Sequence, residues 1–380
     1  MKIIIVGTVA TSIFCFRMPL IKMMLRSGHQ VFAFAIDYND EQKAALSEMG
    51  VVPVDYFLSR SGLNPFSDIK MMYRLMSKFR EINPDVVLSY FSKPVIYGTI
   101  AAYLAKVPKR VAMLEGLGFA FTNQPEGISL KARLIREIQI YLYRISFPLS
   151  TDIIFLNKDD SNDILLKNNV RCNAAYILGG IGLDLEEYRY VKPKVSGVNF
   201  LFVGRLLKEK GIFEFLSAAK EVKERYPNCE FTVLGSSDTT SPNSLSSDEL
   251  KKYVGQGIIN YPGQVENVSN WLIETSVFVL PSYREGVPRS TQEAMAIGRP
   301  ILTTDVPGCR ETVIEGVNGF LVPAFNIDKL VDKMIWFIEN DTRIESMGLA
   351  SRKIAEEKFD VHKVNTEILK IMGVVDEKVL

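Results

Sequence analysis

The sequence predicts an α/β protein built from two doubly wound parallel-sheet domains. Its 380 residues exceed what a single hydrophobic core usually takes, so two domains are expected. In both halves of the chain, short apolar runs alternate with segments whose apolar residues recur at helical spacing. This alternation is typical of parallel strands joined by helices, and it restarts after a break rich in glycine, tyrosine and proline.

The first half contains six runs with the Ile, Val and Phe content of buried parallel strands. They span residues 2–7, 30–36, 51–57, 85–91, 110–116 and 151–157. Between them lie helix-like segments, of which 68–82 is the clearest because its apolar residues recur every three or four positions. We therefore assign residues 1–178 to an N-terminal α/β domain.

Residues 179–198 interrupt the pattern and are predicted to form a linker. Apolar runs then return at 199–204, 229–235, 257–263, 277–282 and 300–305, which assigns residues 199–358 to a C-terminal α/β domain. A final helix-like stretch follows the last strand signal. We expect this segment, 359–380, to pack back on the first domain.

The composition is that of a globular protein, with 47% hydrophobic and 23% charged residues. A net charge of +1 gives no support for a nucleic-acid partner, and none is expected. The first 150 residues carry 18 Lys and Arg against 11 Asp and Glu, which favours an anionic partner there, such as a phosphate-bearing acceptor or a bilayer. An ordinary solvated surface is the alternative. The four cysteines lack CxxC spacing, so a reducing, cytoplasmic setting is expected.

Ligands of open parallel sheets bind at the carboxyl ends of strands, and two such positions in the second domain carry suitable residues. After the run at 199–204, Gly204 allows close approach to the backbone, and the cations Arg205, Lys208 and Lys210 follow. Such cations would offset the charge of a diphosphate, each through a charged hydrogen bond worth about 1.5–3 kcal/mol.

The second position is the stretch YREGVPRSTQEAMAIGRP, residues 283–300. Pro288 suits the first turn of a helix, where free N–H groups favour a bound anion, so 286–291 are predicted to cradle a phosphate. Glu285 and Glu293 flank this cradle, and carboxylates that only accept hydrogen bonds suit sugar hydroxyl groups. Two alternatives are solvated glutamates, or the paired carboxylates of a glycosidase, which would leave the cradle and cations unexplained.

These residues resemble a known family. EGVPRSTQE has the E-x7-E spacing of retaining glycosyltransferases of family GT4, which have the GT-B fold, and FVGRLLKEKGIFEFL is similar to their phosphate-binding loop. The form PRS, with CRETV after it and EGLGFAFT in the first half, looks most like bacterial enzymes of O-antigen, capsule and glycan assembly. Those resemble transferases that move an N-acetylhexosamine from a UDP-sugar to an undecaprenyl-diphosphate-linked acceptor.

The resemblance implies two facing Rossmann-like domains, with the UDP-sugar donor held mainly by the second and the polyprenyl-diphosphate-linked sugar by the first. Retention by front-face attack is expected, without a metal or other cofactor, and the donor sugar is expected to be N-acetylgalactosamine or another hexosamine. The predicted catalytic residues are Glu285, Glu115, Arg205 and Lys210. The predicted donor-binding residues are Gly204, Arg205, Lys210, Gly235, Val265, Glu285, Gly286, Val287, Pro288, Ser290, Thr291 and Glu293. The predicted acceptor-binding residues are Gly7, Thr8, Glu115, Gly116 and Arg289.

The sequence also departs from the family pattern. Many relatives place a histidine before a glycine near the acceptor, whereas this chain has Glu115 and Gly116, and its two histidines lie elsewhere. Glu115 is therefore a candidate for acceptor binding or for the base, with a helix cap or a salt bridge as the alternative. Gly7 and Thr8 lack a G-x-G-x-x-G continuation, which argues against a dehydrogenase. The sequence contains no D-x-D, consistent with a metal-independent reaction.

Residues 129–149 combine four Lys and Arg with Leu, Ile and Tyr. We expect this helix to rest on the inner face of the cell membrane, although a core-packing helix with a charged outer face would look similar. No apolar run is long enough to span a bilayer. A UDP-N-acetylglucosamine 2-epimerase-type enzyme and a non-catalytic nucleotide-sugar-binding protein remain alternative functions.

Overall fold

The computed structural model describes residues 1–58, 65–194, 197–237, 241 and 243–374. The chain divides into two compact units. The first unit comprises Met1–Leu117, Leu130–Ile181 and the segment from Val361 onward, and the second comprises Gly118–Ser129 and Gly182–Asp360. Residues 195–196 of the expected linker and 375–380 of the expected C-terminal segment lie outside the described residues.

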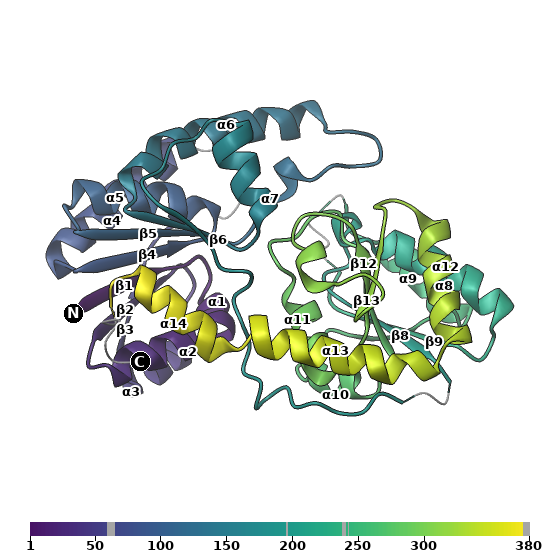
Figure 1. The fold of residues 1–380 in the computed structure, drawn as a ribbon. Helices are drawn as coiled ribbons and strands as arrows, with labels where there is room; N and C mark the ends of the chain where they lie inside the picture. The colour runs from purple at the N-terminus through teal and green to yellow at the C-terminus, as the bar shows by residue number, and fades with distance from the viewer. Residues whose placement is uncertain (59–64, 195–196, 238–240, 242, 375–380) are drawn as a thin grey trace. The chain divides into compact units, whose positions relative to one another are not determined.

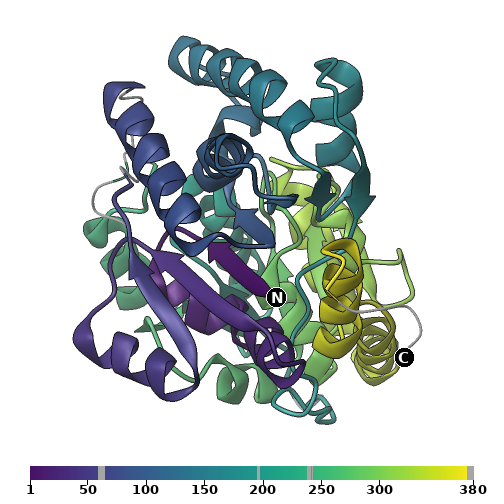
Figure 2. The ribbon, with the colours of Figure 1, turned by 90° about the vertical axis from the view of Figure 1, so that its left-hand side faces the viewer.

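The first unit is built on a seven-stranded parallel sheet of order β3-β2-β1-β4-β5-β6-β7 (Figures 1 and 2). The strand order reverses between β1 and β4, as in a doubly wound sheet, so the helices cover both faces. The strands are β1 (Lys2–Val6), β2 (Gln30–Ala35), β3 (Val51–Asp55), β4 (Val86–Tyr90), β5 (Lys109–Leu114), β6 (Asp152–Phe155) and β7 (Ala175–Ile177). The helices are α1 (Ala10–Phe16), α2 (Met18–Arg26), α3 (Asp40–Glu48), α4 (Pro65–Ile82), α5 (Thr99–Leu104), α6 (Leu130–Ser146) and α7 (Lys158–Ser161), with shorter turns η1 (Pro94–Gly98), η3 (Phe147–Leu149) and η4 (Asn162–Lys167).

The last helix, α14 (Val361–Ile371), belongs to the first unit and lies beside α2 (Figure 1). Its buried residues include Val361, Val364, Ile368 and Leu369, which recur at the three-to-four spacing of one apolar face. The C-terminal helix therefore returns to the first domain, as the fold class predicted.

The second unit has a six-stranded parallel sheet of order β10-β9-β8-β11-β12-β13. Its strands are β8 (Asn199–Val203), β9 (Glu230–Leu234), β10 (Asn260–Gly263), β11 (Val277–Leu280), β12 (Ile301–Thr304) and β13 (Gly319–Val322). Helices α8 (Ile212–Arg225) and α12 (Ile327–Glu339) pack together, as do α11 (Arg289–Ile297) and α13 (Thr342–Lys358). The remaining helical elements are α9 (Ser247–Gly255), α10 (Val268–Ile273), η2 (Phe119–Phe121), η5 (Lys208–Lys210) and η6 (Arg310–Thr312).

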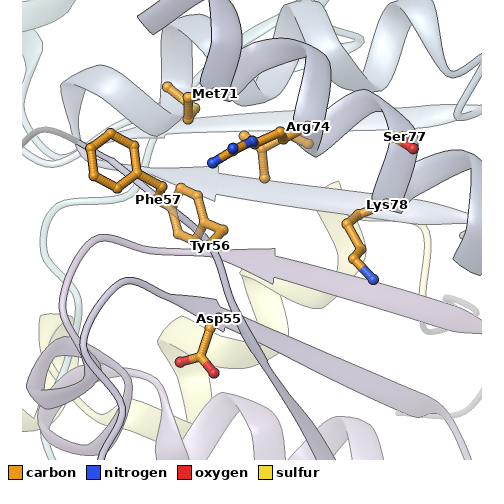
Figure 3. A pocket seen from close by; sticks show the side chains of 8 residues that line it. Asp55, Tyr56, Phe57, Met71, Arg74, Ser77 and Lys78 are labelled. Carbon is orange, nitrogen blue, oxygen red and sulfur yellow. The ribbon is translucent and has the colours of Figure 1, made fainter. Parts of the chain in front are cut away.

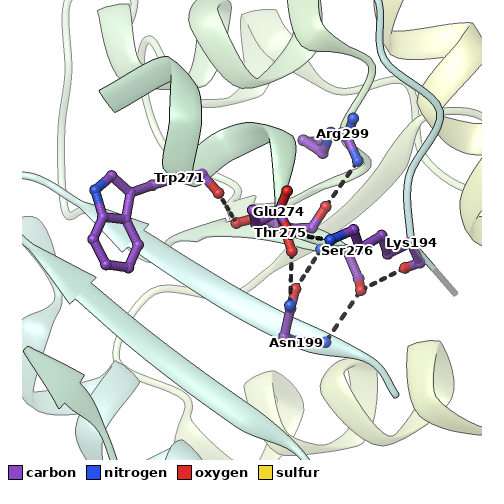
Figure 4. A network of polar contacts seen from close by, with 7 residues as sticks. All are labelled: Lys194, Asn199, Trp271, Glu274, Thr275, Ser276 and Arg299. Atoms are coloured by element: carbon purple, nitrogen blue, oxygen red, sulfur yellow. Dashed lines mark hydrogen bonds and ion pairs between the residues drawn. The ribbon is translucent and has the colours of Figure 1, made fainter. Parts of the chain in front are cut away.

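A polar network fixes the amino ends of the two central strands of this sheet, β8 and β11 (Figure 4). The Ser276 N–H donates to Asn199 Oδ1 at 2.5 Å, and the Asn199 amide donates to the Glu274 carbonyl at 2.8 Å. Ser276 Oγ donates to the Lys194 carbonyl at 2.8 Å. Arg299, fully buried, donates to the Thr275 carbonyl at 2.8 Å, and burial lowers its pKa to about 10. With the amino ends held in this way, the opposite, carboxyl edge presents a fixed surface for a site.

Two boundaries differ from the sequence-based assignment. Gly118–Ser129 clusters with the second unit, although 1–178 was expected to form one domain. The longer segment of the second unit begins at Gly182, inside the expected linker 179–198. The strands β7 and β13 were not expected at all. All three residues of β7 are exposed, so it lacks the buried apolar run that identifies a parallel strand.

Candidate active site

The strand order of the second sheet reverses between β8 and β11. In open parallel sheets, ligands bind at the carboxyl ends of the strands beside such a reversal. Gly204 follows β8, and the Gly204 N–H donates to the Leu234 carbonyl at 3.0 Å. Gly235 has φ +140°, and a Cβ atom there would collide with the Gly204 carbonyl. Glycine is therefore required at 235 if the loops after β8 and β9 are to meet so closely.

Lys210 and Glu285 meet at this edge. Lys210 Nζ lies 2.5 Å from Glu285 Oε1, and Ser282 Oγ donates to the same oxygen at 2.8 Å. Both side chains are largely buried. In this structure Lys210 therefore neutralises Glu285, and a diphosphate placed here would share that cation with the carboxylate.

The loop after β12 contacts the backbone of Glu285. The Glu285 N–H donates to the Pro307 carbonyl at 3.0 Å. Gly308 has φ +79°, and a Cβ atom there would collide with the backbone of Glu285 and Gly286. Neither supporting residue was predicted from the sequence, although the turn-forming run DVPG contained a signal for them.

Helix α11 begins where the phosphate cradle was expected. Pro288 is its N-cap, with an extended backbone, and no side chain caps the helix. Ser290 Oγ donates to the Val203 carbonyl at 3.2 Å. Thr291 is fully buried, and within the described part of the chain its hydroxyl makes no hydrogen bond. Backbone N–H groups at the start of the helix, more than the Thr291 hydroxyl, are thus the available anion donors.

Glu293 lies one turn further along α11, largely buried beside two donors. Tyr188 donates its hydroxyl to Glu293 Oε1 at 3.1 Å, and Arg289 Nε donates to the same oxygen at 3.0 Å. Arg289 also donates to the Gly182 carbonyl at 3.1 Å. Burial raises the pKa of Glu293, while Arg289 and Tyr188 oppose that rise. Tyr188 was missed because it lies 105 residues from Glu293 in the sequence.

The other predicted donor residues differ in exposure. Arg205 is exposed, Val265 is half-buried in the loop after β10, and Val287 is buried. Gly286 follows Glu285 in the loop that Gly308 supports. The structure thus brings Lys210 to Glu285 and Arg289 to Glu293, whereas the side chain of Arg205 is exposed.

The segment Gly118–Ser129 contacts two cations near this edge. Lys208 Nζ lies 2.7 Å from Glu126 Oε1 and 2.8 Å from Oε2, and Arg284 donates to the Phe121 carbonyl at 3.3 Å. Lys208 follows the glycine loop, and Arg284 immediately precedes Glu285. A segment that was expected in the other domain therefore anchors the donor-side loops.

In the first unit, the predicted acceptor residues occupy the carboxyl edge. Gly7 and Thr8 follow β1, and Glu115 and Gly116 follow β5. Glu115 forms an ion pair with Arg17, so the salt-bridge alternative describes its contact. Arg289 lies in the second unit, where it donates to Glu293 and to the Gly182 carbonyl.

A cavity of about 470 Å³ lies beside this edge, between the end of β3 and α4 (Figure 3). Tyr56, in its lining, donates its hydroxyl to the Gly7 carbonyl. Tyr56 and Phe57 supply aromatic rings, while Arg74 and Lys78 supply positive charge. These residues were not singled out from the sequence, because the strand run and the helix pattern explained them fully.

Among the described residues, no cluster of three or more His, Cys, Asp and Glu side chains is placed to hold a metal ion. The helices in the described ranges include none with the length and apolar character that crossing a bilayer demands.

Comparisons with known proteins identify the class. Residues 187–354 match the family described as Glycosyl transferases group 1, and residues 2–157 match that described as Glycosyl transferase 4-like. Among solved structures, the Anabaena protein HepE in complex with UDP has a TM-score of 0.75 at 16% identity, covering 99% of this chain and 100% of its own. Sucrose-phosphate synthase from Thermosynechococcus elongatus has a TM-score of 0.76 at 15% identity, covering 97% and 98%. The fold and the matched families define a glycosyltransferase of the GT-B fold.

The names of two sequence relatives specify their acceptors. The chain is 29% identical, over 90% of each sequence, to N,N'-diacetylbacillosaminyl-diphospho-undecaprenol alpha-1,3-N-acetylgalactosaminyltransferase of Campylobacter jejuni. It is 26% identical, over 70% of each, to UDP-Gal:alpha-D-GlcNAc-diphosphoundecaprenol alpha-1,3-galactosyltransferase of Escherichia coli. The chain belongs to the GT4-type glycosyltransferases, and the named relatives act on undecaprenyl-diphosphate-linked acceptors.

Proposed function

We propose that the protein is a retaining glycosyltransferase that moves a hexosamine, such as N-acetylgalactosamine, from a UDP-sugar to a polyprenyl-diphosphate-linked saccharide. The observation that carries this proposal is the Lys210–Glu285 pair, which lies where the second sheet reverses its strand order. A cation for a diphosphate and a carboxylate for sugar hydroxyls are adjacent there. The uncapped N-terminus of α11 adds backbone donors for an anion.

Each charged residue has a distinct role in this proposal. Lys210, together with the exposed Arg205, neutralises the donor diphosphate and stabilises the leaving UDP. Glu293 accepts hydrogen bonds from the ribose hydroxyls, and Glu285 accepts them from the donor sugar. The bond between the anomeric carbon and the phosphate oxygen breaks as the acceptor oxygen bonds to the same face of that carbon. The proton of the acceptor hydroxyl passes to the leaving phosphate.

The names of the relatives support the substrate classes. One relative acts on an undecaprenol-diphosphate-linked sugar, another is named for UDP-galactose, and a structural neighbour was solved with UDP. The absence of D-x-D from the sequence supports a reaction without a resident metal, in which Lys210 and Arg205 replace the cation. Of these two residues, Lys210 is the one held against the reacting edge.

Helix α6 supports contact with the cytoplasmic face of a membrane. Its exposed apolar residues Leu130, Leu134, Tyr141 and Ile145 recur at positions that share one helix face. Arg133 and Arg144 border this face, as in helices that lie in the interface of an anionic bilayer. A core-packing helix would have turned such a stripe inward, so an interfacial role explains α6 better.

The test is to incubate the protein with a panel of UDP-sugars and a short-chain polyprenyl-diphosphate saccharide and to measure the mass of the lipid product. We expect the mass to increase by one hexosamine with one donor of the panel, and product NMR to give a retained anomeric configuration. Interconversion of the donor without any acceptor would instead indicate an epimerase. Tight UDP-sugar binding without turnover would indicate a sensor.

A further inference from the structure

A charged pair is buried beneath the carboxyl edge of the first sheet. The side chain of Arg17 is 2% exposed and that of Glu115 is 7% exposed, and the two form an ion pair. The Arg17 guanidinium also lies over the ring of Tyr90, 4.4 Å from its centroid. Tyr90 is fully buried and shares a hydrogen bond of 2.7 Å with Ser12 Oγ.

The local sequence explains why Arg17 points inward. Arg17 ends α1 and precedes α2, and its N–H donates to the Ile13 carbonyl at 2.9 Å. Pro19, in the first turn of α2, has no N–H to continue the α1 ladder, so one helix ends and a second begins at Arg17. The break places a permanently charged side chain against the sheet, where only a partner of opposite charge makes its burial tolerable.

The pair lies at the carboxyl edge of the first sheet, where ligands of parallel sheets bind. Glu115 directly follows β5, and Gly116 after it has φ +134°. Gly7 follows β1 at the same edge, and a Cβ atom there would collide with the Tyr90 hydroxyl. Tyr90 therefore contacts both the Gly7 turn and Arg17, which links the turn after β1 to the carboxylate after β5.

We propose that Arg17 is a positioning residue that holds Glu115 as a fixed, ionised hydrogen-bond acceptor for a hydroxyl group of the acceptor saccharide. This inference rests on the proposed function and deepens it, since it names how the first unit recognises the acceptor. A carboxylate held in one place accepts a hydroxyl proton at a defined distance and loses little side-chain entropy on binding.

The same contact argues against Glu115 as the catalytic base. A guanidinium does not give up its proton in proteins, so the pair stays charged. Protonation of Glu115 would leave the buried Arg17 without its counter-charge, which is costly. Glu115 thus binds the acceptor, and the proton of the attacking hydroxyl leaves by another route, as in the proposed front-face reaction.

The first unit contains a matched control for structural effects. Lys109, at the start of the same strand β5, lies 2.7 Å from Asp152, whose side chain is 8% exposed. Lys109→Met and Arg17→Met each remove the cation of a largely buried carboxylate, but at opposite ends of β5. We expect both variants to lose stability, because each leaves a carboxylate without its cation.

Only the Arg17 variant should impair acceptor use. We expect Arg17→Met to raise the acceptor KM at least about tenfold, with UDP affinity by calorimetry within about twofold of the unmodified protein. Lys109→Met should leave the acceptor KM within about twofold. Arg17→Lys should restore part of the loss, and Glu115→Gln should raise the acceptor KM while keeping the fold. These two milder variants test the proposal even if Arg17→Met fails to fold.

Specific results would overturn the inference. An acceptor KM that rises equally in the Arg17 and Lys109 variants would make Arg17 structural only. Recovery of the acceptor KM in Arg17→Met/Glu115→Gln, where the buried charge is gone, would also make Arg17 structural only. If the unmodified protein transfers no sugar to the lipid-linked acceptor, the proposed function itself fails. If it does transfer sugar, and Arg17→Met has the same acceptor KM, only the inference about Arg17 fails.

Discussion

At the scale of single residues, the candidate site contains two pairs of opposite charges that are already formed. Lys210 is held by Glu285, and Glu293 by Arg289 and Tyr188. Such pairs order the side chains before a ligand arrives, which reduces the entropy that binding must overcome. A ligand that binds here must therefore replace part of these side-chain contacts with its own.

Replacing Lys210 by Met should weaken UDP binding about 10- to 100-fold, because a charged hydrogen bond contributes about 1.5–3 kcal/mol and Glu285 would then repel the diphosphate. Titration calorimetry with UDP measures the effect. Lys220→Met is the control, since Lys220 is an exposed cation on α8. Equal UDP affinity in the two variants would remove Lys210 from the donor site.

Glu293→Gln should change how stability depends on pH. Because burial raises the pKa of Glu293, the folded state retains a proton that the unfolded carboxyl, with its ordinary pKa of 4.5, releases. The Glu293 contribution to stability is therefore present at low pH and declines as pH rises above 4.5. Relative to Glu293→Gln, which cannot titrate, the unmodified protein should lose unfolding free energy as the pH rises above 4.5. Urea unfolding of both proteins at several pH values measures the difference between their free energies of unfolding. A difference that stays constant with pH would contradict the prediction.

At the scale of elements, the position of Glu285 depends on a neighbouring loop. Gly308→Ala combines an unfavourable backbone conformation with a collision at Glu285, whereas Gly316→Ala, at φ +73°, meets no atom within 4 Å. Both should lose about 1 kcal/mol from backbone strain. Only Gly308→Ala should lose further stability and UDP affinity, as thermal unfolding and calorimetry would measure. UDP affinity that is intact in both variants would mean that the loop can yield without moving the site.

The exposed face of α6 makes a second prediction at this scale. Leu134→Ser/Tyr141→Ser should reduce flotation with phosphatidylglycerol-rich vesicles, because two large apolar side chains leave the interface. Leu166→Ser is the control, since Leu166 is 74% exposed on η4 of the same unit, compared with 61% for Leu134. If the control reduces flotation to the same extent, the interaction is not specific to α6.

Sequence patterns predicted the elements better than the contacts between them. The apolar runs predicted β1 to β6 and β8 to β12, and most of these strands are buried on both faces, which gives a continuous hydrophobic signal. The edge strands β3 and β10 are more exposed. Helix α11 was predicted from Pro288 onward for a local reason, the fixed φ of proline. By contrast, Arg17 meets Glu115 across 98 positions, and no local pattern encodes a pairing that only the fold creates.

At the scale of the whole molecule, the cysteines offer a separate report on each unit. Cys15 and Cys172 lie in the first unit and have some exposure, whereas Cys229 and Cys309 are buried in the second. Burial raises the pKa of the Cys309 thiol to about 12, so it should be unreactive while folded.

Burial also raises the pKa of the half-buried Cys172 thiol, so thiol labelling in increasing urea should be fastest at Cys15 and slower at Cys172. Cys229 and Cys309 should be labelled only when the second unit opens. UDP should shift the labelling of Cys229 and Cys309 to higher urea, since a ligand stabilises only the state that binds it. Mass spectrometry of the labelled peptides identifies each cysteine. Protection by UDP of Cys15 and Cys172 alone would move the donor site to the first unit.

The segment Gly118–Ser129 has a practical consequence for recombining this enzyme with its relatives. The chain passes between the units at 117/118, 129/130, 181/182 and 360/361, so the two units are not successive blocks of sequence. A hybrid spliced only at the linker would combine a foreign 118–129 with the native Lys208 and Arg284 that Glu126 and Phe121 contact. Exchange of donor specificity between such enzymes should succeed more often when residues 118–129 come from the same parent as the C-terminal half.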